Sequence, residues 1–302
     1  MRIVIAGGSG FLGKALATSL AGDGSDVVVL TREARPASDG IRYVSWRPNG
    51  EAGAWAREID GADAVVNLAG AGIADKRWSA ERKRALEQSR LSSTRSMVKA
   101  IGAAATRPEV LIQGSAEGYY GTFEEDGPEV DESFPAGTDF LGVLCAKWEA
   151  EAAPVKDLGV RLVLARTCIV ISRHGSALPR MLPPFKLFIG GPLGSGRQVM
   201  PWIHLDDWIG MTEWAINNRS VSGPVNFGSP APVTNAQFSQ TLATLLGRPC
   251  WIPVPGFALK IIVGEMAEDV LLRGHRVVPK RALELGYRFK YSAIEQALRA
   301  EL

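Results

Sequence analysis

Histidine and cysteine, the side chains that most often bind metals in proteins, are scarce in this chain. Only three of each occur among the 302 residues, and Cys145, Cys168 and Cys250 lie far apart. Zinc sites usually draw their ligands from closely spaced pairs of these residues, so the pattern predicts no metal centre. A sparse, odd set of cysteines is also typical of reduced thiols rather than of a disulfide framework.

A large excess of one charge and a long apolar run are also missing. The chain has 34 basic and 32 acidic residues, and its net charge of +2 indicates no broad field for nucleic acid or a membrane. No apolar stretch reaches bilayer-spanning length, and a strand-like segment begins at once where a secretory signal would stand. We therefore expect a cytoplasmic globular protein with a small-molecule substrate, no nucleic-acid or membrane partner, and possible assembly as a homodimer.

Glycine, in contrast, is concentrated near the start of the chain. An apolar run at 3–5 suits a strand buried on both faces, and a helical pattern of leucines covers 14–21. In a strand–turn–helix setting, glycines let the backbone approach a pyrophosphate, while the helix N-terminus offers free N–H groups. The alternative is a glycine turn that binds nothing. The glycines of this turn are Gly7, Gly8, Gly10 and Gly13.

Strand-like and helix-like segments alternate through the first half of the chain. This alternation predicts an α/β fold with a Rossmann-type, doubly wound parallel sheet, whose ligands lie beyond the carboxyl ends of the strands. We expect an NADP-binding domain at 1–170, with a later return of the chain near 199–230, and a smaller C-terminal substrate lobe at 171–198 and 231–302. The predicted strands cover 3–5, 26–30, 41–44, 64–68, 110–113 and 160–165, and the predicted helices cover 14–21, 79–104 and 139–153.

The composition changes after Thr167. The segment 172–201 is rich in glycine, proline and basic residues and has little periodicity, which indicates a substrate-facing lobe or a mobile lid. Beyond it, Thr234 and Gln237 match a capping box that opens a helix to about Leu246. Further helices are expected over 257–272 and 292–301. A substrate would then lie between this lobe and the sheet.

The residues after two predicted strands bear on the choice of cofactor. Thr31 and Arg32 follow the second strand, and an arginine there suits the 2′-phosphate of NADP(H), although the next residue, Glu33, complicates the assignment. The alternative for Arg32 is a solvated loop charge. Small residues at 67–70 would leave room for a cofactor across the strand ends, and a plain β-turn explains them equally well.

The motifs together resemble one protein superfamily. The glycine turn, the sequence Asn-Leu-Ala-Gly at 67–70 and Ser115 are similar to the extended short-chain dehydrogenase/reductases, the sugar-nucleotide epimerase superfamily. Later segments narrow the resemblance to its atypical branch of epimerase family or cell-division-inhibitor-like proteins. These segments are 67–72, Trp78, 89–90, 147–149, 190–196, 201–207, 234–238 and 286–289.

The resemblance implies a cofactor, its contacts and a set of catalytic positions. The cofactor is NADP(H), with NAD(H) as the alternative. Ser115 fits the substrate-orienting serine, and Lys147 fits the lysine that lowers the pKa of the catalytic tyrosine and contacts the nicotinamide ribose. The implied cofactor contacts are Gly7, Gly10, Phe11, Leu12, Gly13, Thr31, Arg32, Leu68, Ala69, Gly70 and Lys147.

One departure from the superfamily pattern concerns the catalytic tyrosine itself. Four residues before Lys147 stands Val143, which cannot exchange a proton. Tyr119 is our first choice as substitute acid, with Tyr120 and Glu117 nearby. The alternatives are a packing role for the tyrosine, a surface charge for Lys147 and a turn hydroxyl for Ser115. Arg90 likewise stands where the superfamily often has an asparagine.

Two cations of the second lobe are candidate substrate contacts. Lys186 and Arg197 would suit an anionic substrate such as a nucleotide-sugar phosphate, or they are exposed loop charges. His204 precedes a helix start near Trp208, where a structural role is favoured. Two functions remain open: an oxidoreductase or epimerase-like enzyme on a carbonyl or nucleotide-sugar-like substrate, and a weakly active or inactive NADPH-binding sensor or regulator.

Overall fold

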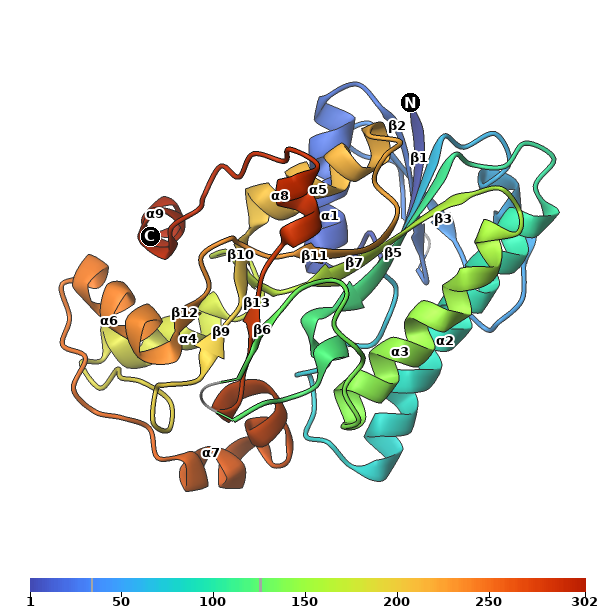
Figure 1. Ribbon diagram of the computed structural model, residues 1–302. Helices are drawn as coiled ribbons and strands as arrows, with labels where there is room; N and C mark the ends of the chain where they lie inside the picture. Colours follow the sequence, from blue (N-terminus) through green and yellow to red (C-terminus); the bar gives the residue numbers. More distant parts are fainter. Residues whose placement is uncertain (34, 125–126) are drawn as a thin grey trace.

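A seven-stranded parallel sheet forms the centre of the protein (Figure 1). This computed structural model describes residues 1–33, 35–124 and 127–302. The strand order is β11-β7-β5-β4-β1-β2-β3, which confirms the predicted α/β class. The order reverses between β1 and β4, so the crevice that binds ligands in such sheets opens at their carboxyl ends. The strands are β1 (Arg2–Ala6), β2 (Asp26–Thr31), β3 (Ile41–Ser45), β4 (Ala64–Asn67), β5 (Val110–Ala116), β7 (Arg161–Thr167) and β11 (Gly223–Phe227).

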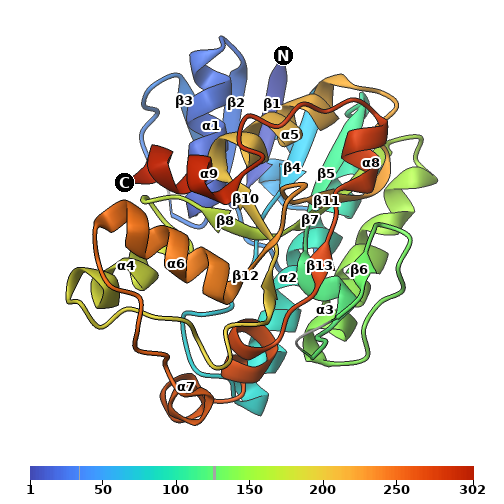
Figure 2. The same ribbon diagram turned by 60° about the vertical axis from the view of Figure 1, so that its left-hand side comes forward.

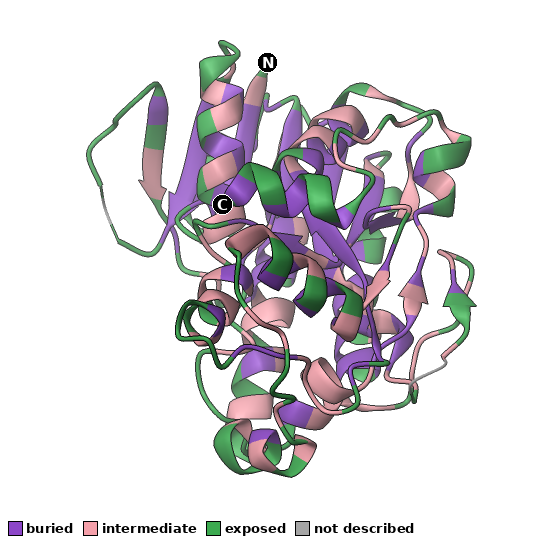
Figure 3. Ribbon diagram, turned by 90° about the vertical axis from the view of Figure 1, so that its left-hand side faces the viewer, coloured by how far each residue is buried: buried purple, intermediate pink, exposed green. Residues whose placement is uncertain are grey.

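Helices cover both faces of this sheet, because its strands are apolar on both sides (Figures 1 and 3). Ile3 and Ile5 face a core shared with α1 and α5, whereas Val4 faces a core shared with α2 and the end of α3. Ser79 caps α2, and its hydroxyl accepts a hydrogen bond from the amide of Arg82 at 3.1 Å. The helical elements are α1 (Phe11–Gly22), α2 (Ala80–Ala103), α3 (Phe140–Ala152) and α5 (Leu205–Asn217), with short turns η1 (Ala54–Glu58), η2 (Glu117–Tyr120) and η3 (Ala153–Lys156).

Most of the remaining elements form a smaller lobe beside the sheet, whereas α8 packs against β11 of the sheet itself (Figure 2). The core of this lobe joins Trp202 and Phe238 to apolar residues of α4 and α9. The capping box of Thr234 and Gln237 opens α6 as predicted. The elements are β6 (Glu129–Val130), β8 (Ile169–Ile171), α4 (Leu178–Lys186), β9 (Val199–Met200), β10 (Trp202–His204), β12 (Val233–Thr234), α6 (Asn235–Leu246), α7 (Gly256–Val263), η4 (Ala267–Leu272), β13 (Arg276–Val277), α8 (Lys280–Glu284) and α9 (Ile294–Glu301).

Two expectations for this lobe need correction. The helix predicted over 257–272 is two elements, because Gly264 takes a left-handed φ of +73° that ends α7. The part after this break, η4, is π-helical, a rare conformation that often marks functional sites. In the irregular segment 172–201, the sequence analysis missed α4, which contains Pro183 and Pro184.

Candidate functional site

The glycine turn between β1 and α1 is closed too tightly for side chains. Gly7 takes a left-handed φ of +80°, and a Cβ there would lie 2.7 Å from the carbonyl carbon of Leu68. A Cβ on Gly13 would lie 2.4 Å from the Gly7 carbonyl oxygen. The turn therefore requires glycine both for its own shape and for its contact with the segment after β4.

The N-terminus of α1 follows directly from this turn. Its N-cap is Gly10, which has no side chain to cap the first amides, and no acidic residue lies in the first turn. The N–H groups and positive dipole end of such a helix suit an anion. A close glycine turn and an uncapped helix start at the sheet's reversal point fit the diphosphate of a dinucleotide.

Polar residues close the second strand as predicted. Thr31 is buried at the end of β2, and Arg32 follows it at the surface. The carboxylate of Glu33, which complicates the choice of cofactor, lies 3.9 Å from the guanidinium of Arg35. Arg32 thus stands at the edge of the sheet where an adenosine ribose would lie.

The segment 67–70 is anchored to the core rather than being a plain surface turn. The side chain of Asn67 is fully buried and donates to Gln113 at 3.0 Å, while its oxygen accepts from the amide of Ala69 at 3.3 Å. Ser93 of α2 donates to the carbonyl of Ala69 at 3.0 Å. The chain beyond β4 is therefore held in one path beside the glycine turn.

Ser115 is tied into a buried ionic network. Its hydroxyl donates to Glu149 at 2.7 Å, and Glu149 accepts two hydrogen bonds from Arg166, each 2.9 Å long. Arg166 is 2% exposed. Burial by itself lowers the pKa of Arg166, but the hydrogen bonds and charge of Glu149 outweigh it and raise that pKa. The serine hydroxyl is thus oriented by a carboxylate that the sequence analysis did not find.

Val143 and Lys147 occupy successive turns of α3 and both reach solvent. Val143 is 42% exposed. The ammonium of Lys147 lies 2.7 Å from the carboxylate of Glu87 on α2, and its side chain is half exposed. Lys147 is therefore paired in this structure, and a contact with a nicotinamide ribose would have to compete with Glu87.

Tyr119 lies in η2, just beyond the end of β5. The guanidinium carbon of Arg166 stands 3.4 Å from the centre of its ring, and the ring of Tyr120 packs against it edge-on. Tyr120 is fully buried and bonded to Asn226, and burial raises the pKa of its phenol far above the usual range. Of the two tyrosines, only Tyr119 is partly exposed at the strand edge.

A carboxylate–imidazole pair that the sequence analysis missed lies at the same edge. His275, just before β13, is 3% exposed, and its Nε2 lies 3.1 Å from Glu117 Oε2 and 3.2 Å from the Glu117 carbonyl. The rings of Tyr120 and Phe123 pack edge-on against the imidazole. No local pattern reveals this pair, because Glu117 and His275 are 158 residues apart in sequence.

The glycine turn, the parallel sheet and the strand order agree with the protein family whose model the chain matches. Residues 3–228 match the model of the NAD dependent epimerase/dehydratase family. The chain belongs to this family. Residues 254–301 match a domain of unknown function, DUF1731, which includes α7, η4 and His275.

Relatives of this epimerase family chain are similar along nearly its whole length. The chloroplastic SDR39U1 homolog of Arabidopsis thaliana is 41% identical over 309 residues, covering 99% of this chain and 86% of the plant protein. The epimerase family protein YfhF of Bacillus subtilis is 38% identical over 304 residues, covering 99% and 97%. A crystal structure of human epimerase family protein SDR39U1 (isoform 2) with NADPH has a TM-score of 0.90 at 34% identity, covering 100% of this chain and 99% of that one. The predicted family resemblance is confirmed.

Three other predicted residues of this epimerase family member lie in the second lobe. Lys186 is exposed at the end of α4, and Arg197 is exposed in the loop before β9. His204 is the N-cap of α5, where its Nδ1 accepts from the amide of Asp206 at 3.1 Å. Burial lowers the pKa of His204, which favours the neutral ring that this cap requires. The structural interpretation of His204 agrees with the structure.

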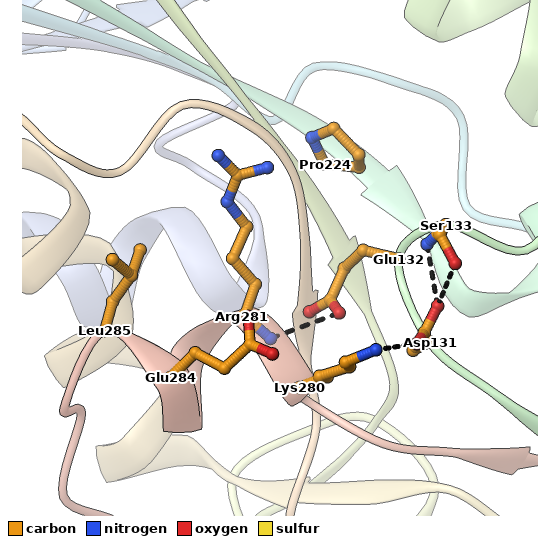
Figure 4. Close-up of a pocket in the computed structure, with 8 residues that line it drawn as sticks. All are labelled: Asp131, Glu132, Ser133, Pro224, Lys280, Arg281, Glu284 and Leu285. Carbon is orange, nitrogen blue, oxygen red and sulfur yellow. Dashed lines mark hydrogen bonds and ion pairs between the residues drawn. The ribbon is translucent and has the colours of Figure 1, made fainter.

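A pocket beside the outer strand β11 contains none of the predicted site residues (Figure 4). Its central carboxylate, Glu132, accepts from the backbone amides of Asn226 and Arg281, and burial raises its pKa. Lys280 pairs with Asp131 at 2.9 Å. These groups fasten α8 to the sheet, so we assign the pocket a structural role. Its lining residues are Asp131, Glu132, Ser133, Pro224, Lys280, Arg281, Glu284 and Leu285.

Proposed function

We propose that the protein is an NADPH-dependent oxidoreductase or epimerase-like enzyme acting on a carbonyl or nucleotide-sugar-like substrate. The observation that carries this proposal is the glycine turn, whose contacts with Leu68 and with the start of α1 leave room for nothing larger than glycine. The human relative crystallised with NADPH supports the choice of dinucleotide. Bound NADPH would supply a hydride at the nicotinamide.

The chain's own residues would position the substrate and move a proton. The hydroxyl of Ser115, near the end of β5, is oriented by Glu149 and would position the polar group of a substrate. Glu117 and Tyr119 lie within four residues of Ser115. The ring of Tyr119 lies against the Arg166 guanidinium, and its hydroxyl would donate a proton to a developing alkoxide. Lys186 and Arg197 supply positive charge on the second lobe for an anionic substrate.

Arg32→Ala is expected to remove most of the preference for NADPH over NADH. The guanidinium would pair with the 2′-phosphate, which NADH lacks, so NADPH affinity should fall about tenfold while NADH affinity stays constant. Thermal-shift titration with each nucleotide measures both, because a ligand bound only by the native state raises its stability. The control is Arg35→Ala, because Arg35 is an exposed neighbouring arginine that pairs with Glu33. An unchanged preference in Arg32→Ala would contradict the assignment.

Tyr119→Phe is expected to slow turnover by about a hundredfold or more, because it removes the proton donor and keeps the ring over which Arg166 lies. The measurement is NADPH oxidation across a panel of small aldehydes and ketones, with NADPH affinity recorded separately. Tyr43→Phe, on β3, is the matched control. Equal rates in Tyr119→Phe and the wild type would exclude Tyr119; a loss in Glu117→Gln alone would move the role to Glu117.

A second candidate function is an NADPH-binding sensor without turnover. Val143 favours the sensor, because this side chain has no exchangeable proton and stands where the superfamily has its catalytic acid. Ser115 and Lys147, together with the basic residues Lys186 and Arg197 of the second lobe, favour the enzyme. NADPH binding without oxidation by any carbonyl, together with NADPH-dependent binding of a protein partner, would support the sensor.

A further inference from the structure

Large apolar side chains are exposed at one end of the second lobe. Eight of the twelve large apolar residues exposed in the described part of the chain lie in three short segments there. Their exposed fractions run from 47% for Ile252 to 71% for Trp251. We call this surface the apolar tip. It consists of Leu187, Phe188, Ile189, Trp251, Ile252, Phe257, Ile261 and Ile262.

Two of the three segments contact each other, and the third, in α7, follows the second directly in sequence. The indole of Trp251 donates to the carbonyl of Phe188 at 3.3 Å, and Leu193 forms a parallel bridge with Val254. Helix α7 buries Leu259 and turns Ile261 and Ile262 outward. Figures 1 and 2 both show α7 at the extremity of the lobe, far from the strands of the central sheet. Exposed apolar surface on this scale marks an interaction site.

Long stretches of sequence around the tip segments contain no acidic residue. The sequence has no acidic residue between Asp157 and Asp206, and none between Glu213 and Glu265. Lys186 directly precedes Leu187, and Arg248 lies 4.4 Å from the centre of the Phe188 ring. Lys260 of α7 pairs with Glu268 of η4 at 2.6 Å, so Lys186 and Arg248 supply the positive charge of the tip. The net charge of +2 for the whole chain conceals this separation of charge.

We propose that the apolar tip docks on an anionic lipid surface. A short amphipathic element with aromatic and aliphatic side chains and basic neighbours lies in the headgroup region with its apolar face inserted. Trp251, Phe188 and Phe257 are the residue types that favour this interface. Basic residues beside them are attracted to acidic phospholipids. Among the described residues no helix is long and apolar enough to cross a membrane, so the attachment is peripheral.

A second copy of the chain fits this surface less well. A self-complementary dimer would bring the tip against itself and place the basic residues of one copy near those of the other. Glu268 already pairs with Lys260, and the tip segments contain no acidic residue that could compensate Lys186 and Arg248 of the other copy. An anionic surface satisfies both the apolar and the cationic parts of the tip.

Vesicle co-sedimentation of the full chain tests the proposal. We expect binding to vesicles of phosphatidylcholine mixed with phosphatidylserine and much weaker binding to phosphatidylcholine alone. The double variant Trp251→Ser/Ile261→Ser should reduce the partition coefficient about tenfold or more, and Arg248→Gln should weaken the dependence on phosphatidylserine. The control is Leu283→Ser on α8, an exposed leucine outside the tip.

Other outcomes would overturn the proposal. These are no sedimentation with either vesicle, equal binding by the double variant and the control, or a dimer in light scattering that the double variant dissolves while vesicles capture nothing. Circular dichroism and NADPH thermal shifts of each variant show that the fold and the nucleotide site persist. The outcome is independent of whether the protein turns over a carbonyl substrate.

Discussion

Glu149→Gln is expected to lower the free energy of unfolding by about 3 kcal/mol. The substitution keeps the shape of the side chain but removes its charge. Arg166, at 2% exposure, would then remain charged inside the protein with only neutral partners. Urea denaturation followed by circular dichroism measures the change.

The control lies two residues further along α3. Glu151 also accepts two hydrogen bonds from an arginine, Arg95, but that arginine is half exposed. Because solvent screens this pair, Glu151→Gln should cost less than about 1 kcal/mol. Replacing Glu149 and Arg166 together with methionine should recover much of the stability, since no uncompensated charge then remains buried. Equal losses of stability in Glu149→Gln and Glu151→Gln would show that burial does not determine the contribution of these ion pairs.

Gly13→Ala is expected to weaken NADPH binding by about a hundredfold or more, which corresponds to about 2.8 kcal/mol. Gly13 is helical and does not need a left-handed backbone, so the effect is purely steric. The new methyl group would lie 2.4 Å from the Gly7 carbonyl oxygen and 2.6 Å from the Gly8 Cα. The turn must open to accept it, which displaces the backbone amides that would contact the diphosphate. Fluorescence titration of NADPH measures the loss.

Gly22→Ala is the matched control at the other end of α1. Nothing lies within 4 Å of the position where its Cβ would stand. Alanine favours the helix over glycine, so this variant should keep its NADPH affinity and gain up to about 1 kcal/mol of stability. Normal NADPH affinity in Gly13→Ala would show that the turn does not hold the dinucleotide.

Local sequence patterns predicted the elements whose structure is determined by residues close together in the chain. The apolar run of β1, the glycine turn and the Ser79 cap of α2 all act within a few residues of one another. The same logic failed at α4, because Pro183 and Pro184 argue against a helix that the packing of Leu178 and Phe185 nevertheless stabilises. The break at Gly264 did have a signal, since glycine commonly ends helices.

Much of the candidate site depends on contacts that no local pattern encodes. Ser115, Glu149 and Arg166 come from β5, α3 and β7, and their types alone do not reveal that they meet. Glu117 and His275 are even further apart in the chain. The sequence placed Ser115 at a strand end but gave no means of finding the carboxylate that orients it.

The contact between Gly7 and Leu68 has a consequence for the order in which the molecule matures. The proposed nucleotide site consists of two segments about 60 residues apart, and its shape depends on β4 lying beside β1. Pairing of parallel strands over such a separation carries a large loop-closure entropy and is intrinsically slow. A nascent chain therefore cannot hold the cofactor while only its first strand and helix have emerged. In the proposed function, the cofactor would bind only after the centre of the sheet has assembled, and it would then stabilise the pairing of β1 with β4.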